Sequence, residues 1–188
     1  MTFRQGPAVA SDGVDPDVGR LVEHFGLEML PVEGTWFANT YRSPVTTAAG
    51  GPVGTAMVGL YSADPPSHSR FHRLVFDEVW HFYRGDPMRL VLLHRDGSSE
   101  DVILGHDLAA GHRVQRAVPA GVWQAGELAP GGRWALFGCT MAPGFTGACF
   151  EGGFVDDLLV AYPGRADDVR RLGIPNGDDA TMPPGYQG

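Results

Sequence analysis

The first regular pattern along the chain is a run of apolar residues at helical spacing. Its members are Val18, Leu21, Val22 and Phe25. Positions three and four apart lie on one face of a helix, so this run predicts an amphipathic helix over residues 15–25. Asp15 can cap the free N–H groups at its start, Pro16 suits the first helical position, and Gly26 is a common helix terminator.

After residue 29 the helical pattern gives way to short apolar or alternating runs. Alternation places apolar side chains on one face of a strand, which is typical of half-buried β-structure. The runs that predict strands are Trp36–Arg42, Thr55–Tyr61, His68–Phe76, Glu78–Tyr83, Met88–His94, Val102–Leu104, His112–Val118, Val122–Glu127 and Arg133–Met141. Turn residues recur about every 8–12 positions, which favours an all-β sandwich or barrel. Two short helices are predicted after the strands, over Val155–Ala161 and Ala166–Leu172.

The composition supports a single folded domain. The chain has 188 residues, 43% of them hydrophobic, which is enough for a substantial core. Its 27 glycines and 15 prolines are scattered between the apolar runs, as turns between strands require. We expect one domain over residues 15–175, a flexible arm over 1–14 and a tail over 176–188.

The net charge of −8 narrows the range of partners. Nucleic acid and anionic lipid both require a basic surface, so we expect neither nucleic acid nor a membrane as a partner. No stretch approaches 18 apolar residues and no signal segment begins the chain, so we expect a cytoplasmic protein. Cys139 and Cys149 lack zinc-type spacing and the density of a disulfide scaffold, which predicts a buried, reduced pair.

Candidate chemistry is concentrated in the segment from residue 71 to residue 87, which reads as strand, turn, strand. Alternation divides the side chains of its second strand between two faces. One face carries Glu78, Trp80 and Phe82, and the other carries Val79, His81 and Tyr83. His72, on the adjoining strand, is expected to approach Glu78 across the strand ladder. Polar groups placed in this way on a barrel point towards one cavity, so we expect a bound small molecule.

Two motifs make the chain resemble a cupin. Glu78 is followed seven residues later by Gly85, as at the end of the first cupin motif. Pro119, Gly121 and Gln124 match the second motif with one change. More closely, the chain resembles a cupin family of small bacterial, fungal and plant proteins without a settled function. Segments that match this family are Glu33–Gly34, Thr40–Ser43, Phe71–Leu74, Asp77–Tyr83, Gly85–Pro87, Leu104–Gly105, Val118–Gln124, Gly138–Thr140 and Ala142–Phe145.

The resemblance covers roughly residues 17–172 and implies a double-stranded β-helix, a jelly-roll barrel with a pocket inside and a homodimeric assembly. Two departures stand out. The family carries an Arg-Glu pair where this chain has Ala38 and Asn39, and Thr35-Trp36 replaces a glycine–aromatic pair. These departures indicate a diverged member, to which family activity cannot simply be transferred.

The metal ligands of cupins are only partly present. The resemblance implies a His-x-His and Glu set in the first motif and a histidine in the second, which suits Fe(II), Mn(II), Zn or Ni. Here His72 and Glu78 remain, but Arg70 replaces the first histidine and Gln124 the last. A nearby arginine also repels a divalent ion. We therefore expect no cofactor. If a metal is bound, its ligands are His72, Glu78 and Gln124.

The leading hypothesis is a metal-independent isomerase, epimerase, cyclase or lyase that works in the barrel pocket. Cupin deoxysugar epimerases use a histidine base with a carboxylate partner. The resemblance implies that His72, oriented by Glu78, removes a proton beside a carbonyl group. An arginine or Gln124 would stabilise the developing oxyanion. The same pair also reads as a structural hydrogen bond. A metal-dependent oxygenase and a non-catalytic binding module are the alternative functions.

The remaining candidates are predicted to bind the substrate. They are Tyr41, Arg42, Tyr61, Arg70, Trp80, His81, Tyr83, Trp123, Gln124 and Met141. Aromatic walls exclude water and position flat or apolar substrates, and arginines bind carboxylate or phosphate. Sugar nucleotides, polyketide intermediates and small carboxylic acids all suit such a set. The aromatic residues also read as core, the arginines as surface ion pairs, and His81 and Tyr83 as contacts with the second sheet or a dimer partner.

Overall fold

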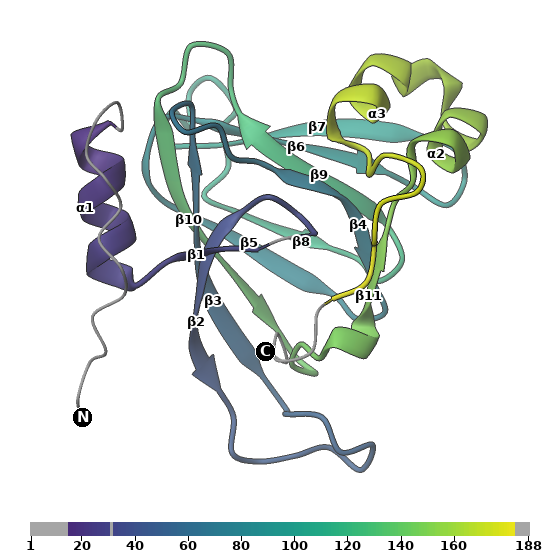
Figure 1. The fold of residues 1–188 in the computed structure, drawn as a ribbon, viewed down its shortest axis with the longest axis horizontal. Coiled ribbons are helices and arrows are strands. Elements are labelled where there is room, and N and C mark those ends of the chain that lie inside the picture. The colour runs from purple at the N-terminus through teal and green to yellow at the C-terminus, as the bar shows by residue number, and fades with distance from the viewer. Residues whose placement is uncertain (1–14, 31, 183–188) are drawn as a thin grey trace.

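Two antiparallel sheets face each other and form the body of the protein (Figure 1). The computed structural model describes residues 15–30 and 32–182. The arm expected over 1–14, and residues 183–188 of the expected tail, lie outside these ranges. The six-stranded sheet has the order β1 (Glu28–Met29), β2 (Trp36–Arg42), β3 (Thr55–Ser62), β10 (Trp134–Met141), β5 (Glu78–Gly85) and β8 (Gln115–Val118). The five-stranded sheet has the order β11 (Phe150–Gly152), β4 (Ser69–Leu74), β9 (Trp123–Leu128), β6 (Met88–Leu93) and β7 (Ser99–Leu104). This arrangement confirms the predicted double-stranded β-helix.

Apolar side chains from both sheets fill the space between them. Leu90 and Leu92 of β6 pack there with Trp80 of β5. Val91 and Leu93 alternate with them along the strand and face outward, under the C-terminal helices. Because β6 is buried on both faces from Leu90 to Leu93, this part of its sequence is a continuous apolar run without polar alternation.

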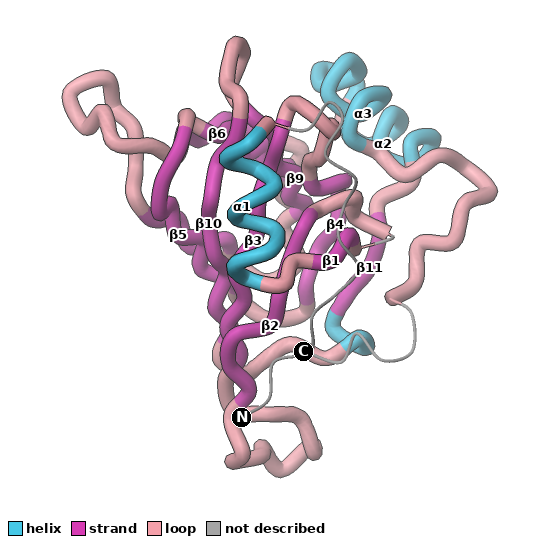
Figure 2. The backbone as a smooth tube through the Cα atoms, turned by 60° about the vertical axis from the view of Figure 1, so that its left-hand side comes forward, coloured by secondary structure: helices cyan, strands magenta, loops and turns pink. Residues whose placement is uncertain are grey.

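One helix covers the outer face of the six-stranded sheet. This helix, α1 (Pro16–Phe25), packs beside β3 and β10 (Figure 2). The Asp15 carboxylate accepts a hydrogen bond from the backbone N–H of Asp17 at 2.9 Å, and Gly26 ends the helix with a left-handed φ of 62°. Both ends therefore form as predicted.

Two further helices cover the outer face of the five-stranded sheet. They are α2 (Val155–Ala161) and α3 (Ala166–Leu172), and both begin and end at the predicted residues. Short 3₁₀ turns lie at Gly147–Cys149, before β11, and at Pro163–Arg165, between the helices. Within the described ranges, no helix is long and apolar enough to cross a membrane.

The structure differs from the expected strands where pairing, not side-chain pattern, sets the boundary. Strands β1 and β11 were not predicted, because two or three residues are too few to show a period. Strand β7 begins at Ser99, three positions before the expected start, since its polar residues pair with β6 at an exposed edge. Strand β8 begins at Gln115 and not at His112.

Candidate functional site

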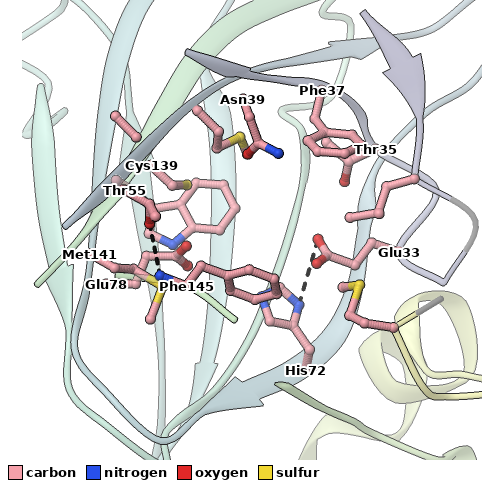
Figure 3. A pocket seen from close by; sticks show the side chains of 15 residues that line it. Glu33, Thr35, Phe37, Asn39, Thr55, His72, Glu78, Cys139, Met141 and Phe145 are labelled. Carbon is pink, nitrogen blue, oxygen red and sulfur yellow. Dashed lines mark hydrogen bonds and ion pairs between the residues drawn. The ribbon is translucent and has the colours of Figure 1, made fainter. Parts of the chain in front are cut away.

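A cavity of about 70 Å³ opens inside the barrel, between side chains from both sheets (Figure 3). One water needs roughly 10–15 Å³ of such space, whereas pockets for drug-sized ligands start near 300 Å³. The cavity therefore fits a ligand of a few non-hydrogen atoms, or the end of a larger molecule. Its polar lining residues are Glu33, Thr35, Asn39, Thr55, His72, Glu78 and Cys139, and its apolar ones are Leu30, Phe37, Ala56, Met57, Trp80, Met141, Phe145 and Met182.

His72 projects from β4 into the cavity and is only 3% exposed. Its Nδ1 lies 2.8 Å from the carbonyl oxygen of Arg70. A carbonyl oxygen only accepts hydrogen bonds, so Nδ1 carries the proton and Nε2 of the neutral ring keeps its lone pair. The ring also stacks on Phe150, with 5.3 Å between centroids. These contacts hold the imidazole in one orientation and one tautomer.

Glu78, at the start of β5, presents a buried carboxyl group to the same cavity. The amide Nε2 of Gln124 donates to its Oε2 at 2.8 Å, and the amide oxygen of Gln124 accepts from the Trp80 indole at 2.8 Å. Burial raises the pKa of Glu78 to about 7. His72 and the hydrogen bond from Gln124 lower this pKa, and the neighbouring Glu33 raises it. Glu78 is therefore a carboxyl group that changes charge near neutral pH.

Glu33 supplies a second carboxyl group on the other side of His72. Its Oε2 lies 3.9 Å from Nδ1 of the imidazole. Burial raises the pKa of Glu33, against the lowering effects of His72 and a hydrogen bond with Ser69. The Ser69 hydroxyl also contacts the hydroxyl groups of Tyr61 and Thr35, each at 2.7 Å. The two carboxyl groups and the imidazole thus form one electrostatically coupled group.

The residue-by-residue sequence analysis did not single out Glu33. This residue lies in the loop between β1 and β2, where no periodicity indicates the direction of a side chain. The backbone N–H of Arg70 donates to the Glu33 carbonyl at 3.0 Å and fixes the loop beside β4. The matching Glu33–Gly34 segment in the cupin resemblance was the available signal.

The predicted approach of His72 and Glu78 across a strand ladder is wrong. Strand β4 belongs to the five-stranded sheet and β5 to the six-stranded sheet, because the chain crosses between sheets at the turn that joins them. The two residues instead line the cavity from opposite sheets. The groups that orient His72 are the Arg70 carbonyl and Glu33.

Two of the predicted substrate-binding residues, Trp80 and Met141, line the cavity. Gln124 is buried behind Glu78, and both ends of its amide are engaged. Tyr61 is buried in the core and donates its hydroxyl hydrogen to Ser69. These two residues support the cavity from behind but do not line it.

The predicted arginines do not line the cavity. Arg70 forms an ion pair with Asp178 at 3.7 Å, and Arg42 is exposed at the end of β2 beside the exposed Tyr41. Trp123 also lies elsewhere, with the guanidinium of Arg73 4.5 Å from its ring. Alternation does not explain the position of Arg70, which is two residues before His72; the pairing of β4 with β9 shifts its register between Ser69 and His72.

His81 and Tyr83 lie on the face of β5 that points away from the cavity, as the alternation predicts. Nε2 of His81 lies 2.9 Å from the Thr140 hydroxyl, and Nδ1 lies 2.8 Å from the Gln115 amide nitrogen. Tyr83 stacks beside His81 and is 46% exposed. Neither residue therefore contacts a ligand in this cavity.

Both cysteines are free and buried, as expected. Cys139 lines the cavity from β10. Burial raises the pKa of its thiol well above the ordinary value, and the nearby Glu78 and Glu33 raise it further. A thiol that resists ionisation in this way is a poor nucleophile, so Cys139 forms part of the cavity wall beside Glu78.

The polar groups of the cavity do not fit a cupin metal centre. The amide oxygen of Gln124, which would be the third ligand, accepts the Trp80 indole N–H, and its nitrogen donates to Glu78. Across residues 15–30 and 32–182, no three His, Cys, Asp or Glu side chains are grouped closely enough to hold a metal ion.

The comparisons with known proteins agree with this architecture. Residues 19–152 match the family described as Cupin superfamily (DUF985), and the chain belongs to that family. An X-ray structure of a Shewanella oneidensis protein is 31% identical, covers 83% of this chain and 96% of its own, and superposes with a TM-score of 0.76. A hypothetical protein from Leishmania major is 24% identical, covers 81% and 96%, and has a TM-score of 0.72. No curated protein matches significantly. Fold, family and cavity together define a small-molecule-binding cupin.

Proposed function

We propose that the protein is an enzyme that moves a proton at a carbon beside a carbonyl group, as an isomerase, epimerase, cyclase or lyase does. The proposal includes the cytoplasmic location and the homodimer expected from the sequence. Its main support is the grouping of one imidazole and two carboxyl groups in an otherwise largely apolar cavity. Such surroundings tune pKa values towards neutral pH, which general acid–base catalysis needs.

His72 acts as the general base in this proposal. Its Nε2 has a lone pair because Nδ1 donates to the Arg70 carbonyl. When Nε2 takes the proton from carbon, the ring becomes a cation, and Glu33 stabilises that cation from 3.9 Å. The orienting role that the sequence analysis assigned to Glu78 therefore passes to Glu33.

Glu78 acts as the acid towards the carbonyl oxygen. As the C–H bond breaks, its electron pair moves into the carbonyl group, and protonated Glu78 donates its proton to the developing oxyanion. The sequence analysis assigned oxyanion stabilisation to an arginine or Gln124. Among the described residues, however, no arginine lines the cavity and the Gln124 amide is engaged. A pKa of about 7, set by burial and by His72, Glu33, Gln124 and Cys139, keeps much of Glu78 protonated at neutral pH.

Deuterium exchange tests this proposal with simple carbonyl compounds, so the natural substrate need not be identified first. Hydroxyacetone, aminoacetone and pyruvate are similar in size but differ in charge. Each is incubated with the protein in D₂O, and loss of the α-C–H signal is followed by ¹H NMR. We expect exchange of at least one compound above the buffer rate, and a decrease of about 10²-fold or more in His72→Gln. Exchange should also fall as the pH rises through about 7, because Glu78 then loses the proton that it donates.

The matched control is His94→Gln. His94 follows β6, pairs with Glu100 at 3.2 Å and does not line the cavity, so its replacement should leave exchange unchanged. Circular dichroism checks that each variant is folded. Undiminished exchange in folded His72→Gln would contradict the mechanism. A wild-type rate equal to that of buffer for all three compounds would favour a binding module without chemistry.

A further inference from the structure

The charged groups that line the cavity are not balanced. Glu33 and Glu78 provide two carboxyl groups, and His72 is the one basic side chain among the described lining residues. Arg70, two positions away on β4, is engaged by Asp178 and takes no part in the lining. An anionic ligand would therefore enter against two carboxyl groups with a single imidazole to compensate it. A cationic ligand would find a compensating carboxyl group at Glu33, whereas Glu78 carries its proton in the proposed reaction.

The free hydrogen-bonding atoms deep in the cavity also favour a cationic ligand, because they are acceptors. The Nε2 atom of His72 belongs to a residue that is 3% exposed, and no described residue bonds to this atom. Its lone pair accepts a hydrogen bond, as do the carboxyl oxygens of Glu33. The hydroxyl groups of Thr35 and Thr55 are already bonded to other parts of the protein. The deep part of the cavity thus favours a ligand that carries hydrogen-bond donors.

The apolar walls are also compatible with a cation. Phe37, Trp80 and Phe145 line the cavity beside Met141 and Met182. Aromatic faces attract cations, whereas they give an anion nothing to replace its water. The cavity volume of about 70 Å³ admits a molecule of a few non-hydrogen atoms.

The order of the three groups indicates how such a ligand would lie. In Figure 3 the imidazole of His72 lies between Glu33 on one side and Glu78 on the other. We infer that the pocket takes a small α-ammonio carbonyl compound, with its protonated amine at Glu33, its reacting C–H at His72 and its carbonyl oxygen at Glu78. This inference rests on the proposed proton transfer, whose base and acid occupy the last two positions.

Binding measurements on three small compounds test the inference. Aminoacetone carries an ammonium group, hydroxyacetone is its neutral counterpart and pyruvate is an anion of similar size. Isothermal titration calorimetry at pH 7 should show that aminoacetone binds about tenfold or more tightly than hydroxyacetone, since a hydrogen bond to a charged group contributes that much. Pyruvate should bind more weakly than either.

Variants locate the effect at one carboxylate. Glu33→Gln should reduce the affinity for aminoacetone about tenfold more than it reduces the affinity for hydroxyacetone, and the remaining binding of hydroxyacetone shows that the pocket is intact. Glu28→Gln is the matched control, because Glu28 is exposed on β1 and does not line the cavity. If Glu33→Gln does not fold, the comparison of the three compounds on the wild-type protein still tests whether the pocket prefers an ammonium group.

The outcomes separate this inference from the proposed function. Equal or weaker binding of aminoacetone than of hydroxyacetone would overturn the assignment of an ammonium ligand, even if His72-dependent exchange of hydroxyacetone upheld proton transfer. Preferential binding of aminoacetone without exchange would support the ligand class and remove the proposed chemistry. Tighter binding of Zn²⁺ than of aminoacetone, lost in Glu33→Gln, would also overturn the inference.

Discussion

At the scale of single residues, the buried carboxyl group of Glu78 links the pocket to folding stability. Its pKa rises from 4.5 to about 7 in the folded protein, mainly through burial. Between these pH values the native state holds a proton that the unfolded chain releases. The stabilisation that protonated Glu78 contributes is therefore fully present below about pH 4.5 and is lost as pH rises through 7. At about 1.4 kcal/mol per pKa unit, the loss is about 3 kcal/mol.

Replacement of this carboxyl group should remove the pH-dependent loss. We expect the free energy of unfolding of Glu78→Gln, measured relative to that of the wild type, to increase by up to about 3 kcal/mol from pH 5 to pH 8. Urea denaturation at several pH values measures this difference. Glu28→Gln, with an exposed side chain on β1, should show no such gain. A constant difference between wild type and Glu78→Gln would mean that Glu78 ionises normally.

The two catalytic candidates differ in how far the sequence could locate their partners. His72 and Glu78 were predicted because strand alternation fixes the direction of each side chain. Their hydrogen-bond partners were assigned incorrectly. The Arg70 carbonyl lies two residues before His72 on the same strand, and Gln124 reaches Glu78 from the opposite sheet. Local spacing determines where a side chain points, and tertiary contacts determine what it meets.

At the scale of elements, the end of β5 depends on a glycine. Gly85 has a φ of 100°, and a Cβ at this position would overlap the carbonyl oxygen of Trp134 on the paired strand β10. Any side chain here therefore combines backbone strain with a clash against backbone that cannot move away.

A pair of alanine substitutions separates strain from clash. Gly97, in the turn between β6 and β7, has a similar φ of 85° but no atom within 4 Å of a Cβ. We expect Gly97→Ala to lower the free energy of unfolding by about 1 kcal/mol. Gly85→Ala should lower it by about 3 kcal/mol, because the clash adds to the strain. Thermal and urea denaturation measure both. Equal effects would show that β10 can move away from the added Cβ without a loss of stability.

At the scale of the whole molecule, a network of ion pairs joins the C-terminal helices to the barrel. Asp168 on α3 accepts hydrogen bonds from Arg89 of β6 at 2.8 Å, from Arg171 at 2.7 Å and from Arg165 at 3.2 Å. Burial alone would raise the pKa of Asp168, but these arginines outweigh it and hold the pKa at about 2. The resulting stabilisation is present above about pH 4 and is lost as pH falls through 2.

Loss of this carboxylate should loosen the helices from the sheet. We expect Asp168→Asn to lower the free energy of unfolding by about 2–3 kcal/mol at pH 7, because three arginines lose a charged partner. Asp167→Asn is the matched control. The Asp167 side chain is 98% exposed, so its pair with Arg170 should contribute less than about 0.5 kcal/mol. Urea denaturation compares the two variants, and equal effects would contradict a structural role for the network.

The sequence by itself determined the helices, most strands and the inward face of β5, because these follow from spacings of two and of three to four residues. Only the tertiary structure decided that His72 and Glu78 come from opposite sheets, that Glu33 enters the cavity and that the arginines leave it. The physical reason is range. Side-chain direction depends on neighbours along the chain, whereas sheet membership and loop position depend on contacts between residues distant in sequence.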